Sequence, residues 1–384
     1  MRSRKASACG RVLIDLITAN PHDYGFVFNP DLFAEIISKA AVAAGRYAPD
    51  AQGVPAAREA IAQVHGLGIS LDQVILTPGT SLAYFYAFRL FADPGDDILC
   101  PAPTYPLFDD LARLAGLNIR RYHLNREYRD GSVRYTIDPD EIAFQITPRT
   151  RMMAVVSPHN PTGTIVSQSE WHELAPIINE RKITVAFDEV FRDFTLSPEA
   201  EVSRPAEGGI ARSVCLNGLS KMLSLPGLKA GWMTVEGEQE FIQPSLNALE
   251  YLSDMFLPVS DISQQAIPEL LGQSGLAENH RLMERYRTAL KSVLDICREG
   301  HQTVNQPESG PYLCFPLDTK FLGREEAVAL LLLQKYGVLV HPGSLYQFSE
   351  PTLVTTCVNQ AGFAAAAQLL SLDPASPRLL PGSH

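Results

Sequence analysis

Short apolar runs alternate with longer amphipathic segments through most of the chain. The runs have the length of buried strands, and the segments between them place apolar residues at helical spacing. The clearest runs are Val74–Leu76, Ile98–Cys100, Met152–Val156, Ile183–Phe187 and Val214–Leu216. Strands separated by helices predict an α/β fold with a mostly parallel sheet that helices cover on both faces.

The alternation of strands and helices is densest in the middle of the 384-residue chain. We therefore expect a large domain over residues 45–285. Residues 1–44 and 286–384 are expected to form a smaller α+β domain. The tail after Leu372 is rich in Pro and Ser, which predicts disorder.

The charge and the cysteine content of the chain exclude some classes of binding partner and of site. The formal net charge is −11, from 43 acidic and 32 basic residues, and this argues against nucleic acids and anionic membranes. No apolar stretch approaches the roughly 20 residues of a membrane span. The six cysteines form no CxxC pair, so we expect reduced thiols in a cytoplasmic protein without a metal.

Polar residues follow the predicted strands, where open α/β sheets bind ligands. Gly79, Thr80 and Ser81 come after the first run and enter a helix, and the free amides of a helix N-terminus suit a phosphate. Later strands are followed by an aromatic residue, an amide, a carboxylate and an amine, namely Tyr105, Asn160, Asp188 and Lys221.

This set of groups suits pyridoxal 5′-phosphate. The amine of Lys221 can form a Schiff base with the cofactor's aldehyde. The carboxylate of Asp188 can keep the ring nitrogen protonated, so that the ring accepts electrons from the α-carbon of a substrate.

Three motifs in this order resemble those of the class I/II aminotransferases, which are fold type I pyridoxal-phosphate enzymes. They are Asn160-Pro161-Thr162-Gly163, Asp188-Glu189 and Ser220-Lys221, and the resemblance runs from about Tyr47 to Ser344. It implies the aminotransferase fold, with a large cofactor-binding domain and a smaller domain built from both ends of the chain.

The resemblance also implies a role for each site residue. Lys221 is the Schiff-base lysine and moves the proton at the α-carbon, and Asp188 pairs with the pyridine nitrogen. Asn160 binds the 3′-oxygen of the cofactor, and Tyr105 stacks on its ring. The remaining cofactor-binding residues lie around the phosphate and beside the lysine: Gly79, Thr80, Ser81, Ser220 and Lys229.

Tyr47 resembles a tyrosine that reaches the phosphate of the neighbouring subunit. This resemblance implies a homodimer with shared active sites.

The chain departs from the family pattern in three places. Phe191 replaces a tyrosine that tunes the 3′-oxygen, and Gly218 and Lys229 replace a serine and an arginine at the phosphate. The arginine that clamps the substrate's α-carboxylate is missing from the strand after His341-Pro342-Gly343-Ser344, where Thr355 stands at about its position.

An aminotransferase with a non-standard amino substrate is therefore the leading hypothesis. The alternative is a lyase of the same fold that catalyses elimination, replacement or decarboxylation. A non-catalytic regulatory module is a more remote alternative. An arginine from elsewhere in the chain, such as the N-terminal segment, could also supply the missing clamp.

Overall fold

The computed structural model describes residues 13–18, 20–66, 68–129, 132–197, 200–300 and 302–371. The tail expected to be disordered lies outside these ranges, as does Cys9. The other five cysteines are buried and unpaired, as expected. No helix in the described ranges is long and apolar enough to cross a membrane, and no group of acidic, His or Cys side chains there could hold a metal ion.

A seven-stranded sheet forms the centre of the fold, with the order β2-β10-β9-β8-β7-β3-β4. Its strands are β2 (Val74–Thr77), β3 (Asp97–Ala102), β4 (Asn118–His123), β7 (Thr150–Val156), β8 (Thr184–Asp188), β9 (Arg212–Gly218) and β10 (Gly231–Gly237). Only β10 runs antiparallel to its neighbours. The prediction of a mostly parallel sheet is confirmed, because the other six strands share one direction.

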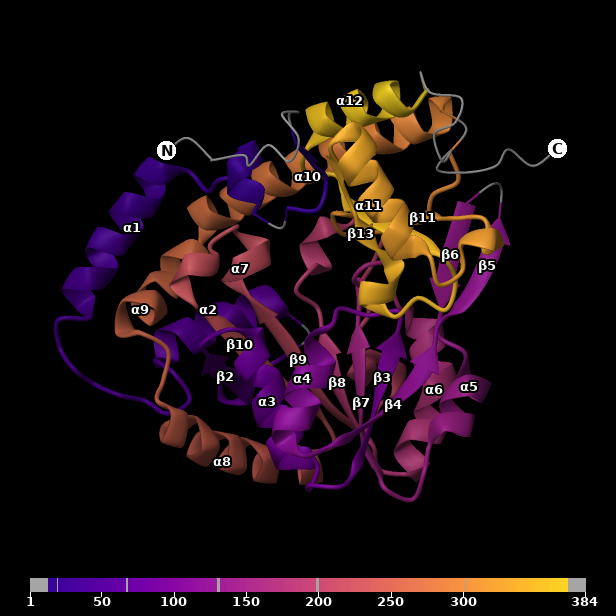
Figure 1. Ribbon diagram of the computed structural model, residues 1–384. Helices are drawn as coiled ribbons and strands as arrows, with labels where there is room; N and C mark the ends of the chain where they lie inside the picture. The colour runs from indigo at the N-terminus through magenta and orange to yellow at the C-terminus, as the bar shows by residue number, and fades with distance from the viewer. Residues whose placement is uncertain are drawn as a thin grey trace.

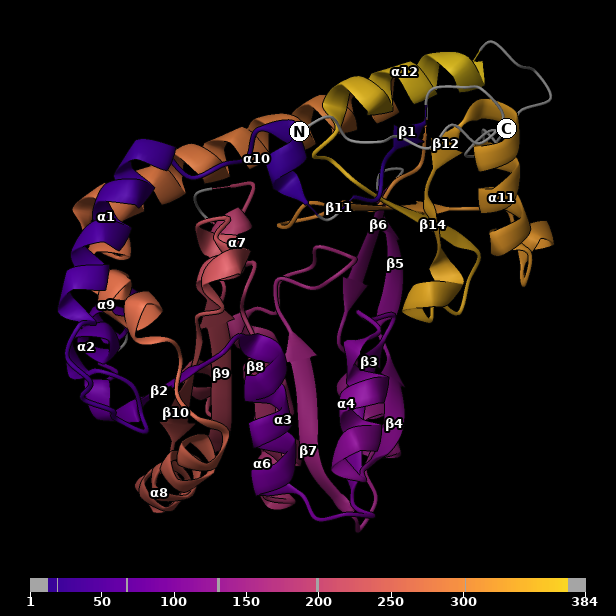
Figure 2. The same ribbon diagram turned by 60° about the vertical axis from the view of Figure 1, so that its left-hand side comes forward.

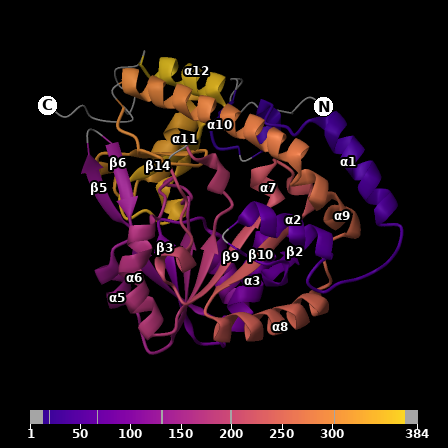
Figure 3. The ribbon, with the colours of Figure 1, turned by 180° about the vertical axis from the view of Figure 1, so that it is seen from behind.

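Helices cover both faces of this sheet, as expected (Figures 1 and 3). One face packs against α3 (Thr80–Phe91), α4 (Leu107–Ala115) and α8 (Gln239–Phe256), which contribute Phe88, Phe108 and Leu249 to a shared core. The other face packs against α5 (Pro139–Gln145) and α6 (Gln168–Glu180). A third core joins α1 (Pro30–Ala43), α2 (Pro55–His65) and α9 (Asp261–Leu270) to β2 and β10.

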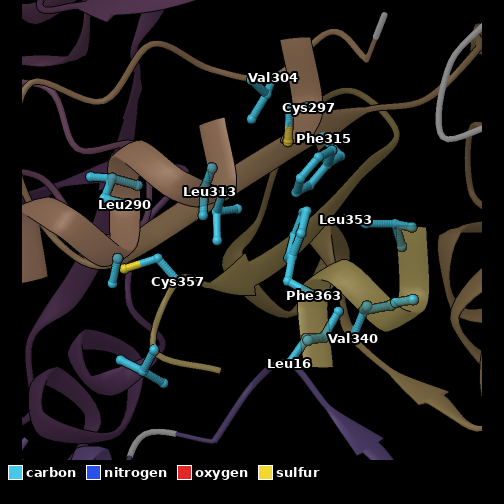
Figure 4. Close-up of a cluster of buried hydrophobic side chains, with 14 of the residues drawn as sticks. Leu16, Leu290, Cys297, Val304, Leu313, Phe315, Val340, Leu353, Cys357 and Phe363 are labelled. Atoms are coloured by element: carbon cyan, nitrogen blue, oxygen red, sulfur yellow. The ribbon is translucent and has the colours of Figure 1, made fainter. Parts of the chain in front are cut away.

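A second, smaller sheet lies beyond the carboxyl ends of the large one (Figure 2). It has the order β11-β14-β13, with β11 (Tyr312–Pro316), β14 (Thr352–Thr356) and β13 (His341–Pro342). Helices α10 (Gln273–Glu299), α11 (Glu325–Tyr336) and α12 (Gln360–Ser371) enclose a core with this sheet, part of which Figure 4 shows. The domain boundaries near residues 45 and 285 stay a prediction.

The sequence pattern did not indicate the hairpin of β5 (Asn125–Arg129) and β6 (Ser132–Thr136), strand β11, or strand β1 (Ile14–Asp15). Strand β1 pairs in parallel with β12 (Val338–Leu339), which lies within the strand that the apolar run Val338–Val340 predicts. The two residues of β1 are too few to show an alternating pattern. The β1–β12 pair attaches the N-terminal segment to the smaller sheet's core, because Leu16 packs there (Figure 4).

A buried ion cluster fixes the end of β8. Glu189 is fully buried, and its carboxylate accepts hydrogen bonds from Arg204 Nε at 3.0 Å, Arg204 Nη2 at 2.9 Å and Arg192 Nη1 at 2.9 Å. His65, the last residue of α2, places its Nδ1 3.5 Å from the same carboxylate and its Nε2 2.9 Å from Glu236 on β10. The cluster therefore ties three elements to the residue that directly follows Asp188.

Burial alone would raise the pKa of Glu189. The nearby charges of Arg204, His65 and Arg192 outweigh it and lower that pKa to about 2. Because the folded pKa lies below the ordinary 4.5, Glu189 contributes stability above about pH 4.5 and loses it as the pH falls towards 2.

We predict that Glu189→Gln lowers the free energy of unfolding by about 3–5 kcal/mol at neutral pH, because it leaves the buried Arg204 without its counter-charge. Urea denaturation followed by circular dichroism measures this loss. The matched control is Glu284→Gln, since Glu284 is exposed and lies 3.5 Å from Arg287. Its loss should stay at or below about 1 kcal/mol. Equal losses in the two variants would contradict the role of the buried cluster.

Candidate active site

The carboxyl ends of the parallel strands bring the predicted site residues to one edge of the sheet. Val156 on β7, Asp188 on β8 and Leu216 on β9 are direct neighbours in register. Asn160 follows β7 by four residues, and Lys221 lies in the short helix α7 (Leu219–Met222) that follows β9. The structure thus places the amide, the carboxylate and the amine in consecutive loops.

Asp188 is buried and held by two hydrogen bonds. Tyr84 Oη on α3 donates to its Oδ2 at 2.9 Å, and the Val190 amide donates to its Oδ1 at 3.0 Å. Burial raises the pKa of Asp188 to about 6, although both hydrogen bonds and the positive charge of Lys221 act in the opposite direction. A cation next to this carboxylate would restore its ordinary ionisation.

Lys221 faces the same desolvated space. Burial lowers the pKa of its amine, and the carboxylate of Asp188 partly opposes this effect. Its Nζ lies 5.7 Å from the centre of the Phe191 ring and forms no hydrogen bond or ion pair with the part of the chain that the structure describes. A lysine of lowered pKa without a fixed partner is suited to act as a nucleophile or a base.

Asn160 is buried, and its Oδ1 has no hydrogen-bond partner among the described residues. Its side chain lies close enough to the phenol of Tyr312 on β11 to lower the pKa of that phenol. Tyr105, which follows β3, is 47% exposed and lies close enough to Tyr312 and Tyr346 to raise the pKa of both phenols. Tyr105, Tyr312 and Tyr346 therefore form a group contributed by separate parts of the chain, with Tyr312 next to Asn160.

Close backbone approach shapes the predicted phosphate corner. Thr77, Gly231 and Gly218 lie side by side in register on β2, β10 and β9. A Cβ on Gly231 would lie 3.1 Å from the backbone of Gly79, and a Cβ on Gly218 would lie 2.9 Å from the Ala230 carbonyl oxygen. Packing against β10 thus explains why glycine stands at position 218. Gly79 has a φ of 102° and no side chain caps α3, so the first amides of this helix are open to a ligand.

The remaining predicted residues lie around this corner or outside it. Thr80 is half-buried and Ser81 exposed in the first turn of α3, and Ser220 is half-buried in α7. Lys229 is exposed, directly before the strand that contacts Gly79. Tyr47 is 81% exposed in the loop between α1 and α2.

The side of the smaller sheet that faces the site is largely apolar. In the β11–β14 pair, Tyr312 is opposite Thr356 and Cys314 is opposite Val354. Cys314 Sγ donates to the Pro161 carbonyl at 3.4 Å, and Val354 packs with Cys314 and Tyr346, so these residues line the side towards the Asn160 loop.

Thr355 lies on the opposite side of β14 and shares it with Leu353 and Cys357 of the core. Its hydroxyl is buried without a hydrogen-bond partner in the described structure. The residue that faces the site at this level is therefore Val354, which cannot bind a carboxylate.

Sequence reasoning missed Tyr84, Tyr312 and the cluster around Glu189. Tyr84 follows Ser81 by three residues on one helix, so the two share a face, and this spacing could have indicated it. Tyr312 gave no comparable signal, because β11 lies more than 80 residues beyond α7 in the chain.

His159 is buried beside Asn160, and its Nδ1 lies 2.8 Å from Thr162 Oγ1. Burial lowers the pKa of His159 to about 3, so its ring is neutral.

Comparison with known proteins gives the same picture. The sequence profile of the family "Aminotransferase class I and II" matches residues 31–368. Glutamate-pyruvate aminotransferase AlaA of Escherichia coli K12 is 27% identical over 354 residues, which cover 89% of this chain and 85% of that protein. Aspartate/prephenate aminotransferase of Thermus thermophilus is 28% identical over 353 residues, which cover 88% and 86%.

Solved structures show the same fold. Alanine aminotransferase from Pyrococcus furiosus superposes with a TM-score of 0.81 at 23% identity, covering 94% of this chain and 93% of that one. The fold is therefore that of the fold type I aminotransferases, as the motifs implied. The profile match spans the whole of the large sheet and most of the smaller unit, and the three relatives named here are aminotransferases rather than lyases. This chain is an aminotransferase and belongs to the class I and II family.

Proposed function

We propose that this aminotransferase binds pyridoxal 5′-phosphate at the edge formed by Asn160, Asp188 and Lys221, with Lys221 as the covalent attachment point. The observation that carries the proposal is the pair of Asp188 and Lys221, which are both desolvated and oppositely charged but not bonded to each other in the described structure. Members of this family generally depend on this cofactor, and the relatives named above share the fold.

The described residues fit the cofactor's chemistry. The amine of Lys221 is free to bond an aldehyde, and the carboxylate of Asp188 has a raised pKa that a cationic ring nitrogen would bring back down. The buried Oδ1 of Asn160 has no partner and the uncapped start of α3 has open amides, so a polar group and an anion would each find a binding position.

When bound, pyridoxal phosphate supplies an aldehyde that condenses with amines and a ring that accepts electrons from the α-carbon. The chain supplies the rest. Asp188 stabilises positive charge at the ring nitrogen, and Tyr84 holds Asp188 in place. Lys221, with its lowered pKa, accepts the proton from the substrate's α-carbon and returns it elsewhere, which is the proton movement that transamination requires.

The proposed site is completed by a second copy of the chain. Tyr47 is exposed on the loop between α1 and α2, and Gly53 follows it in the same loop. An exposed side chain is expected if Tyr47 is donated to a neighbouring subunit. We predict a homodimer of two 42.1-kDa chains. Light scattering of the purified protein measures the mass in solution, and a fully active monomer at the assay concentration would rule out shared sites.

We predict that the purified protein is yellow and that borohydride reduction fixes the cofactor to Lys221. Peptide mass spectrometry locates the adduct. Lys221→Ala should abolish the adduct, whereas Lys229→Ala, which removes an exposed lysine at the phosphate corner, should leave it on Lys221. An adduct on any other lysine in the wild-type protein would refute the assignment.

We also propose that the substrate is an amino compound that is not anchored through an α-carboxylate. The site-facing side of β14 presents Val354 where the family's arginine clamp is missing, and Cys314 and Tyr346 pack around it. An α-carboxylate entering there would lose one or two hydrogen bonds to a charged group, each worth about 1.5–3 kcal/mol.

Alanine and its alcohol, 2-amino-1-propanol, form a matched pair that differs at this group alone. We predict that alanine gains at most about tenfold in kcat/KM over the alcohol. An arginine clamp would give roughly tenfold to twenty-thousand-fold, at about 1.4 kcal/mol per factor of ten. Stopped-flow loss of the cofactor's absorbance, with product analysis, measures both values.

An ordinary amino acid that is transaminated with a kcat/KM of about 10⁴ M⁻¹s⁻¹ or more, within the usual range for enzymes, would contradict the substrate proposal. The same result would leave the cofactor assignment intact, because the borohydride adduct reports that independently.

A further inference from the structure

Position 191 lacks the hydroxyl that the family pattern places near the cofactor's 3′-oxygen. Phe191 is buried, packs edge-on against Phe194 at 5.2 Å between ring centres, and lies beneath the amine of Lys221 at 5.7 Å. Its ring can neither donate nor accept a conventional hydrogen bond. The environment of that oxygen therefore depends on hydroxyl groups from other elements.

Tyr312 approaches Phe191 from the smaller sheet and carries such a hydroxyl. Its ring meets the Phe191 ring edge-on, with 6.0 Å between centres and 90° between planes. The Asn160 side chain lies close enough to the Tyr312 phenol to lower its pKa, as expected when an amide N–H is directed at the phenol oxygen. The proton of Tyr312 then remains available for another acceptor.

The protonation state of Tyr312 suits a donor. Burial raises the pKa of Tyr312 to about 12, with a further contribution from Tyr105 and an opposing one from Asn160. The phenol is therefore neutral at physiological pH and keeps its O–H. Tyr346, the other tyrosine of this group, is instead engaged with His341, whose Nδ1 lies 3.0 Å from the Tyr346 hydroxyl.

We propose that the Tyr312 hydroxyl takes over the role of the missing tyrosine at position 191 and donates a hydrogen bond to the 3′-oxygen of the cofactor, beside Asn160. This inference rests on the proposed binding of pyridoxal phosphate at Lys221. It places one determinant of the cofactor's electronic state in the smaller sheet, on β11, rather than at the end of β8.

A donor at this oxygen has a measurable consequence. It stabilises negative charge on the oxygen, so the oxygen holds the neighbouring Schiff-base proton less strongly and the pKa of the Schiff base falls. Removing the donor should therefore raise that pKa. The change in absorbance between the protonated and unprotonated forms reports the pKa without any substrate or turnover.

The experiment is a spectral pH titration of the cofactor-loaded enzyme with Tyr312→Phe. We expect the Schiff-base pKa to rise by roughly one unit, in line with the effect of losing a hydrogen bond to a charged group. The matched control is Tyr122→Phe, which removes the hydroxyl of a buried tyrosine that donates to the Ala154 carbonyl at 2.9 Å instead. The control should titrate like the wild type.

The double variant Phe191→Tyr/Tyr312→Phe separates the hydroxyl from the packing. It returns a phenol to the family's position, and the pKa should move back towards the wild-type value. A pKa in Tyr312→Phe within a few tenths of wild type, an equal rise in Tyr122→Phe, or a double variant that keeps the raised value would each overturn the inference. A borohydride adduct still on Lys221 in these variants shows that the proposed function holds even then.

Discussion

The active site depends on two opposite charges that lie close to each other in a largely desolvated place. Asp188 and Lys221 lie at the ends of neighbouring strands, and burial disfavours the charged form of each. They are not bonded to each other, so a ligand placed between them can bind both. The sheet makes this arrangement possible, because parallel strands deliver their carboxyl ends to a single edge while helices exclude water from both faces.

The surroundings of this pair are built to hold it still. Tyr84 on α3 fixes the Asp188 carboxylate, and the buried cluster of Glu189 with its two arginines fixes the backbone immediately beyond it. Such clusters are weak sources of net stability but costly to break. These contacts keep the Asp188 carboxylate inside the site, whereas an unrestrained carboxylate would turn to solvent.

The large sheet and three residues of the site could be predicted from the sequence, because both depend on local patterns. Apolar strands of four to seven residues are visible as runs, and the polar residues that end them in an α/β fold meet at one edge, which gave Asn160, Asp188 and Lys221. The antiparallel direction of β10 and the pairing of β1 with β12 could not be predicted, because they depend on partners far away in the chain. Tyr312 and Val354 belong to this second group: register across β11–β14, not local pattern, decides which side chains face the site.

The ring nitrogen of the cofactor gives the most direct test of the account. Nitrogen-15 NMR of the enzyme loaded with ring-labelled pyridoxal phosphate reports whether that nitrogen carries a proton. Well above pH 6 the Asp188 carboxyl is ionised, since burial raises its pKa only to about 6. We predict that the ring nitrogen of the cofactor is protonated at pH 8 in the wild type and unprotonated in Asp188→Asn. The same nitrogen signal in both proteins would contradict it.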